Sequence, residues 1–171
     1  SNMLHDLGNL VAQRAAAYFE GLREDIQLFV NLHPAQLAEP GPLIQSLTPL
    51  LPYAHRCVLE ITERSRLRGI DEWEMAIEKL QSAGFAIAVD DLGAGYNALS
   101  ILADLQPKFI KIDMSIVRNC DTEQRKQRLV DLLAKFSDAT GALMVAEGVE
   151  TDAEAYIKTR PGEDFINVYI A

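Results

Sequence analysis

Two adjacent aspartates and a lysine are the residues of this sequence best suited to chemistry. Asp90 and Asp91 end an apolar run that begins at Phe85, and Lys111 lies inside a second run, residues 109–113. Aspartates at the end of a strand often only cap the next turn, and a strand lysine often only pairs with them. The alternative is that these charged side chains form a reaction site, and other polar residues of the chain favour it.

Polar side chains also end or interrupt the other apolar runs. Asn31 lies in the run 26–32, Glu60 in 57–63 and Glu147 in 143–149. The steps from Asn31 through Glu60, Asp90 and Lys111 to Glu147 are 29, 30, 21 and 36 residues, each about one β-α unit. In a (β/α) barrel such positions meet at one mouth, where active sites are built.

The donor atoms of this set are oxygens. Asn31, Glu60, Asp90 and Asp91 have no histidine or cysteine at a metal-binding spacing beside them, which favours Mg²⁺ or Mn²⁺, with Ca²⁺ possible, over Zn²⁺. Two such ions about 3.5 to 4 Å apart suit phosphoryl chemistry, because they activate a water and hold the departing oxygen. The simpler interpretation, that each residue is a capped or hydrogen-bonded strand end, stays open.

The apolar runs alternate with segments of helical periodicity. We expect helices at residues 4–22, 42–47, 71–82, 123–139 and 152–158, and strands at 26–32, 57–63, 85–89, 109–113, 143–149 and 164–170. Strands separated by helices predict a parallel sheet and an α/β fold. Two predicted helices have apolar stripes that we expect to face the core: Leu4, Leu7, Val11, Ala15, Tyr18 and Leu22 in the first, and Leu129, Leu132, Leu133 and Phe136 in the long one.

Composition limits the classes of protein to consider. The chain has 171 residues, 49% hydrophobic and 24% charged, and a net charge of −9, which excludes a disordered chain and argues against a DNA-binding surface. No apolar run approaches the roughly 20 residues of a membrane span. Ser1, Asn2 and Met3 resemble a tag remnant, so we expect one domain at residues 4–171. Cys57 and Cys120 fit a reduced, cytoplasmic protein.

Four segments together resemble the EAL domain family, bacterial phosphodiesterases that open cyclic di-GMP to linear pGpG. They are Phe-Val-Asn-Leu at 29–32, Leu-Glu-Ile-Thr-Glu at 59–63, Asp-Asp-Leu-Gly-Ala-Gly-Tyr at 90–96 with Ile-Lys-Ile-Asp at 110–113, and Ala-Glu-Gly-Val-Glu-Thr at 146–151. The resemblance covers about residues 4 to 160 and implies a TIM-like (β/α) barrel of EAL type.

The resemblance implies a role for each residue of the set. Asn31, Glu60 and Asp90 would bind a first Mg²⁺ or Mn²⁺, and Asp91 a second ion or its water. Lys111 would orient or help deprotonate the attacking water, and Glu147 would act as base or as ligand of the second metal. Ca²⁺ would inhibit.

Further residues would support this site. Glu63 would steady the loop from Asp91 to Tyr96, which in the family also contributes to a homodimer, and Glu150 and Asp113 would be supports. Asn167 stands where the family has the glutamine of a Gln-Gly-Tyr motif that would meet substrate. The partners implied are cyclic di-GMP, a second copy of the chain, and fused or paired sensory or GGDEF-type domains.

The sequence also departs from the family pattern. The first strand, with its Glu-Ala-Leu, is missing before Leu4, and Val168 replaces the glycine of the last motif. The barrel would then be incomplete: the chain is a fragment of a longer enzyme, a natural remnant that binds without turnover, or a protein that borrows a strand from a second copy.

Three functions are therefore compared. The first is a metal-dependent phosphodiesterase for cyclic di-GMP. The second is a weak or inactive module that binds cyclic di-GMP or a partner protein. The third is an unrelated metal-dependent barrel of aldolase or enolase type, which would need phosphate-binding glycines after its last strands; the tail offers Gly162.

Overall fold

A computed structural model describes residues 2–19, 21–62, 67, 70, 72–93, 98–151 and 168–170. It divides into two compact units, residues 1–61 with 65–87 and residues 62–64 with 88–171. In chain order the elements up to the third helix are α1 (Asn2–Phe19), β1 (Leu28–Asn31), η1 (Pro34–Ala38), α2 (Pro40–Ser46), η2 (Thr48–Arg56), β2 (Cys57–Thr62) and α3 (Trp73–Ser82). The others are β3 (Ala86–Leu92), α4 (Ala98–Leu105), β4 (Phe109–Ile112), α5 (Met114–Val117), α6 (Gln124–Thr140), β5 (Leu143–Ala146) and β6 (Val168–Ile170).

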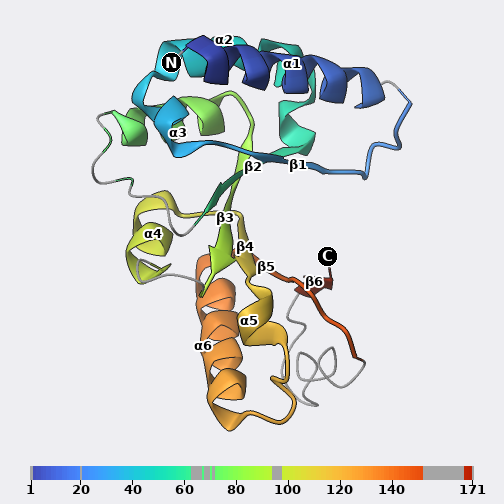
Figure 1. Ribbon diagram of the computed structural model, residues 1–171, viewed down its shortest axis with the longest axis vertical. Helices are drawn as coiled ribbons and strands as arrows, with labels where there is room; N and C mark the ends of the chain where they lie inside the picture. The colour runs from blue at the N-terminus through green and yellow to red at the C-terminus, as the bar shows by residue number, and fades with distance from the viewer. Residues whose placement is uncertain are drawn as a thin grey trace. The chain divides into compact units, whose positions relative to one another are not determined.

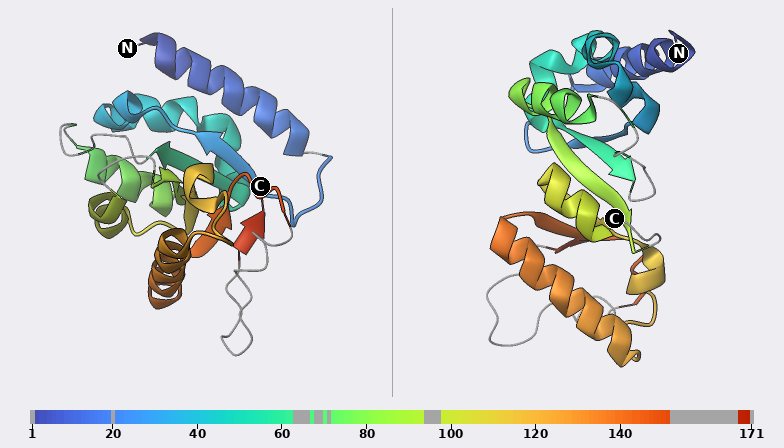
Figure 2. Two further views of the ribbon diagram at one scale, coloured as in Figure 1. Left: turned by 60° about the horizontal axis from the view of Figure 1, so that its bottom comes forward. Right: turned by 90° about the vertical axis from the view of Figure 1, so that its left-hand side faces the viewer.

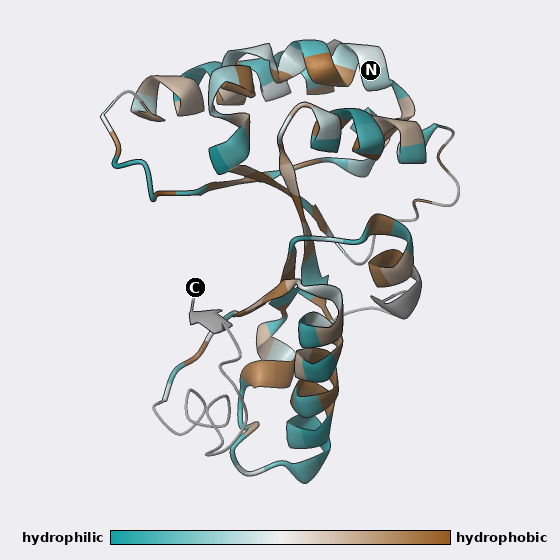
Figure 3. Cartoon of the chain, turned by 180° about the vertical axis from the view of Figure 1, so that it is seen from behind, coloured by the Kyte–Doolittle hydropathy of each residue, from teal (hydrophilic) through white to brown (hydrophobic). Residues whose placement is uncertain are grey.

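The strands pair in parallel, as the alternation with helices predicts. In the first unit β1 pairs with β2, with Leu28 opposite Cys57 and Asn31 opposite Glu60. In the second unit β3 pairs with β4, β4 with β5 and β5 with β6. The buried residues of β1 to β5 are mostly apolar, and much of these five strands is brown in Figure 3. None of the described helices is long and apolar enough to cross a membrane.

Helix α1 packs along α2 and η2 (Figure 1), but not through the stripe expected from the sequence. Ala12 and Phe19 are buried, whereas Leu7 and Tyr18 are 57% and 75% exposed. Relative to the predicted stripe, the buried face is shifted by one residue, a rotation of about 100° about the helix axis. Small residues allow the close approach: a Cβ at Gly8 would lie 3.1 Å from Nε2 of Gln36.

Helix α6, which packs on α5 and β5 (Figure 2), has the same one-position rotation. Of the predicted stripe Leu133 is buried, but Leu129 and Leu132 are 39% and 60% exposed. The buried set is Val130, Leu133, Ala134 and Ser137. The helix again packs through its smaller side chains, so the expectation for Leu129 and Leu132 is wrong. In α3, by contrast, the predicted stripe of Trp73, Ala76, Ile77 and Leu80 is buried.

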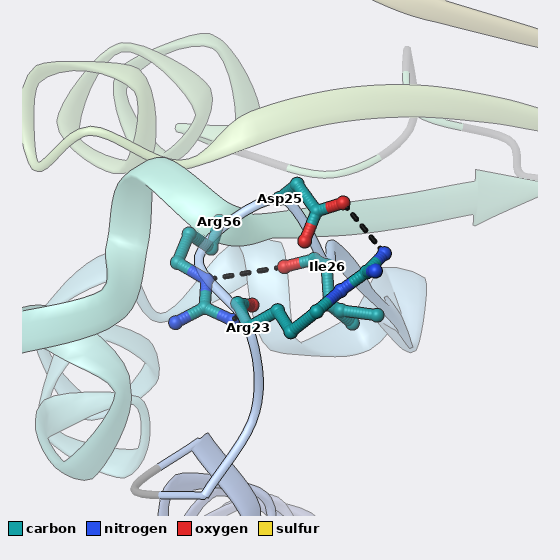
Figure 4. Close-up of polar contacts among 4 residues, drawn as sticks. All are labelled: Arg23, Asp25, Ile26 and Arg56. Carbon is teal, nitrogen blue, oxygen red and sulfur yellow. Dashed lines mark hydrogen bonds and ion pairs between the residues drawn. The ribbon is translucent and has the colours of Figure 1, made fainter.

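The first unit also contains a buried arginine that the sequence did not reveal. Arg56, 7% exposed, donates hydrogen bonds from Nε to the carbonyl oxygen of Ile26 (3.1 Å) and from Nη2 to that of Arg23 (2.5 Å). Its guanidinium lies 4.5 Å from the centroid of the Phe19 ring. Figure 4 shows the contact with Ile26 beside the ion pair of Arg23 and Asp25. Arg56 therefore joins η2 to the segment between α1 and β1.

Candidate functional site

The end of β3 is irregular at the two aspartates. Val89 pairs with Ile110 and Leu92 with Ile112, so Asp90 and Asp91 together lie opposite Lys111. Asp91 has a φ of +57°, the left-handed region that non-glycine residues seldom adopt. An extra residue in one strand is a β-bulge, and bulges re-aim side chains next to active sites.

The bulge explains how two successive residues can serve one site. In a regular strand neighbouring side chains point to opposite faces, yet one carboxylate oxygen each from Asp90, Asp91 and Glu147 lie within 4.8 Å of one another. We call these three residues the acid cluster. The sequence held a signal for the bulge, since two adjacent metal ligands on one strand conflict with its alternation.

Glu147, the third member of the acid cluster, is the residue directly after β5. Its main-chain N–H donates a hydrogen bond to the carbonyl oxygen of Ile112 (3.1 Å), which ties the end of β5 to the end of β4. On the other side of β4 the N–H of Asp113 donates to the carbonyl oxygen of Leu92 (3.2 Å). The strand ends that supply the acids are therefore held by main-chain bonds.

Lys111 connects two members of the acid cluster. Its Nζ lies 2.9 Å from Oδ1 of Asp90 and 2.7 Å from Oε1 of Glu147. The three side chains are 12%, 13% and 26% exposed. Three carboxylates and one ammonium sum to a formal charge of −2, which is costly where water is partly excluded. A divalent cation would balance it.

The donor set fits such a cation. The acid cluster offers only carboxylate oxygens, from partly buried side chains, and hard ions such as Mg²⁺, Mn²⁺ and Ca²⁺ prefer these donors. Among the residues that the structure describes, no thiol or imidazole joins this group. The residues therefore fit the class of ion that the sequence predicted.

Asn31 and Glu60 lie side by side in the first unit. They are paired in register, Asn31 as the last residue of β1 and Glu60 two residues before the end of β2, so their side chains lie on one face of that strand pair. The N–H of Leu32 donates to the main-chain oxygen of Glu60 (2.9 Å). The Glu60 side chain is buried, with the residue 5% exposed. Their shared role with the acid cluster stays a prediction.

The structure describes two of the predicted supports, whose roles stay predictions. Asp113 caps α5, its Oδ1 accepting a hydrogen bond from the N–H of Ser115 (2.8 Å). Glu150 forms an ion pair with Arg118 (2.5 Å) in which both side chains are about half exposed. Glu63, Asn167 and the part of the Asp91 to Tyr96 loop after Gly93 lie outside the described residues.

Comparison with known proteins decides the family. The family model for the EAL domain matches residues 1–165. The chain belongs to the EAL domain family. A probable cyclic di-GMP phosphodiesterase of Escherichia coli, PdeG, is 32% identical over 152 residues, 87% of this chain and 30% of that protein.

Solved EAL structures share the fold. The EAL domain of Mycobacterium smegmatis DcpA superposes with a TM-score of 0.81, at 29% identity over 96% of this chain and 76% of that one. Klebsiella pneumoniae BlrP1, solved in complex with manganese and cyclic di-GMP, gives a TM-score of 0.78, at 29% identity over 91% of this chain and 40% of that one. These likenesses confirm the predicted α/β, TIM-like fold of EAL type.

This EAL chain spans about a third or less of the curated relatives it matches. It covers 30% of PdeG and 22% of MucR, a bifunctional diguanylate cyclase and cyclic di-GMP phosphodiesterase of Pseudomonas aeruginosa.

Proposed function

We propose that this EAL domain hydrolyses cyclic di-GMP to linear pGpG with Mg²⁺ or Mn²⁺ held at the acid cluster, and that Ca²⁺ inhibits it. The observation that carries the proposal is the grouping of Asp90, Asp91 and Glu147 within 4.8 Å around an ammonium that contacts two of them. The manganese and cyclic di-GMP bound by Klebsiella pneumoniae BlrP1 support the choice of ion and substrate.

The metal would be held by the acid cluster, and the family resemblance predicts Asn31 and Glu60 as further ligands. When bound, it supplies positive charge that offsets the charge of the phosphodiester. With a net charge of −9, the chain would otherwise repel a dinucleotide. The carboxylates therefore prepare the site for an anionic substrate only in the presence of the cation.

Lys111 and Glu147 would divide the handling of the attacking water. An ammonium has three N–H donors and no acceptor, and two of them are directed to Asp90 and Glu147. The positive charge of this ammonium, beside both acids, would orient the water or a phosphoryl oxygen. Lys111 is thus the orienting group, and a carboxylate oxygen of Glu147 receives the proton that the water loses.

The proposal extends to partners and location. A cyclase and a phosphodiesterase share one chain in Pseudomonas aeruginosa MucR, by its name, and we propose that this domain acts beside a sensory or GGDEF-type domain in the cytoplasm. We also propose a homodimer through the loop from Asp91 to Tyr96.

Two parallel assays test the proposed activity. Release of pGpG from cyclic di-GMP is measured with Mn²⁺, and nucleotide binding is measured with Ca²⁺ in place of Mn²⁺. We expect turnover with Mn²⁺ and binding without turnover with Ca²⁺. Binding of the nucleotide with either ion but no turnover would indicate a cyclic di-GMP-binding module instead of an enzyme. Absence of both binding and turnover would show that cyclic di-GMP is not the substrate.

A further inference from the structure

The short helix α5 lies against the residues that follow two of the cluster acids. Asp113, two residues after Lys111, is the N-cap of α5, and the helix begins at the next residue. Its side chains approach two glycines. Gly93 comes two residues after Asp91, and Gly148 comes directly after Glu147.

The contact with Gly93 leaves no room for a side chain. A Cβ there would lie 2.0 Å from Cδ1 and 2.9 Å from Cγ1 of Ile116. Gly93 has a φ of +103°, which L-residues rarely adopt. Ile116 is 7% exposed, so its side chain is held by its surroundings and fixes the course of the chain just after Asp91.

The contact with Gly148 is equally close. A Cβ there would lie 2.8 Å from Cβ of Met114 and 3.8 Å from its Cα. These are the stem of the side chain and the main chain, which cannot rotate away as the end of a long side chain can. The backbone after Glu147 therefore rests directly on α5.

We infer that α5 sets the spacing of the acid cluster, with Ile116 and Met114 as positioning residues for Asp91 and Glu147. One turn of helix, which follows the strand that carries Lys111 and is capped by Asp113, approaches the segments after both acids at Gly93 and Gly148. A shift of either loop changes the distance between the carboxylates. Substitution of residues that support metal ligands typically lowers metal affinity by about 10- to 100-fold. This inference rests on the proposed metal site.

The first test compares two glycine substitutions of equal backbone cost. Gly148 and Gly141 both have a left-handed conformation, with φ of +64° and +73°, but a Cβ at Gly141 would meet nothing within 4 Å. We expect Gly148→Ala to weaken Mn²⁺ binding by about tenfold and Gly141→Ala to leave it unchanged. Free Mn²⁺ is measured by electron paramagnetic resonance on folded protein.

The second test shortens a side chain of α5. Ile116→Ala removes both atoms that approach Gly93 and should weaken Mn²⁺ binding by about tenfold, whereas Ile116→Val, which keeps one γ-carbon in that direction, should retain most of it. Val117→Ala is the matched control, because Val117 is 2% exposed on the same turn and is not among the atoms nearest to either glycine. If Ile116→Ala fails to fold, Gly148→Ala at the contact with Met114 still tests the role of α5.

The outcomes separate this inference from the proposed function. If the unaltered chain binds Mn²⁺, and Gly148→Ala and Ile116→Ala bind it as tightly as their controls, the role of α5 is wrong and the metal site stands. If the unaltered chain binds no Mn²⁺, the metal site itself is wrong, and the role of α5 is wrong with it.

Discussion

Arg56 and Lys111 are two largely buried cations of this chain that are compensated in opposite ways. Arg56, in the first unit, contacts two main-chain carbonyl oxygens and an aromatic ring. Lys111, in the second, contacts two carboxylates, and a third lies with them. Main-chain dipoles and a ring solvate one charge without adding another, whereas the acid cluster exceeds its lysine by two charges.

Under the proposed function, this difference separates a structural charge from a functional one. Arg56 joins two segments and has a role that is complete without any ligand. The excess of negative charge around Lys111 is costly in the fold alone and becomes favourable when a cation binds. Substitutions in the two places should therefore affect different properties.

The largest effect is expected for Asp90→Asn. The amide keeps the size of the side chain but removes its charge and the ion pair with Lys111, so Mn²⁺-dependent hydrolysis should fall by more than about 100-fold. Circular dichroism should report an unchanged fold. Asp138→Asn, at an exposed position of α6, is the control; equal activity in the two variants would contradict the role of Asp90.

Arg56→Met should lower stability and spare the site. The change removes two hydrogen bonds and a cation–π contact, at a cost of about 2 kcal/mol in the free energy of unfolding. Mn²⁺ affinity should not change. Urea unfolding measures the free energy of unfolding and titration measures the Mn²⁺ affinity, with the exposed Arg23→Met as control. A loss of Mn²⁺ affinity in folded Arg56→Met would contradict a purely structural role of Arg56.

The cysteine next to Arg56 predicts a pH dependence. Burial raises the pKa of the Cys57 thiol from 9.0 to about 11, against an opposing effect of Arg56. Between these values the unfolded chain loses the thiol proton first, so the folded state binds more protons and stability falls as pH rises, by about 3 kcal/mol in all. Urea midpoints at pH 8 and pH 11 should differ more for the unaltered chain than for Cys57→Ala. Equal differences would show that Cys57 is not responsible.

The smallest effect is expected for Glu150→Gln. Its ion pair with Arg118 joins two side chains that are 61% and 48% exposed, and such surface pairs contribute less than about 1 kcal/mol. Thermal unfolding and Mn²⁺ affinity should both stay close to those of the unaltered chain. A loss of tenfold or more in affinity would make Glu150 a true support of the site, as the family resemblance implies.

The sequence predicted the strands better than the helix faces. Apolar runs ending in polar residues located β2, β3, β4 and β5 to within a few residues, because burial on both sides leaves little choice of composition. The faces of α1 and α6 were misplaced by one position. The stripes were predicted mainly from leucines, but small residues such as Ala12 and Ala134 are buried in the two helices. How closely a helix approaches its neighbours depends on tertiary packing, which the helical pattern does not contain.

Four of the predicted site residues lie together in the structure, in a geometry that the sequence did not predict. Asp90, Asp91, Lys111 and Glu147 come together in the second unit, as residue types at strand ends suggested. The bulge at Asp91 and the support from α5 depend on backbone angles and on contacts between distant segments. The burial of Arg56 was not predicted, because its carbonyl partner lies 30 residues away in the sequence and the residues around Arg56 give no sign of it.

The most direct test of the account is to locate manganese in crystals of this chain by its anomalous scattering. We predict a peak between the carboxylates of Asp90, Asp91 and Glu147 that disappears in Asp90→Asn. Manganese bound elsewhere on the chain, with none at these three carboxylates, would contradict the claim that their excess charge exists to hold a divalent cation.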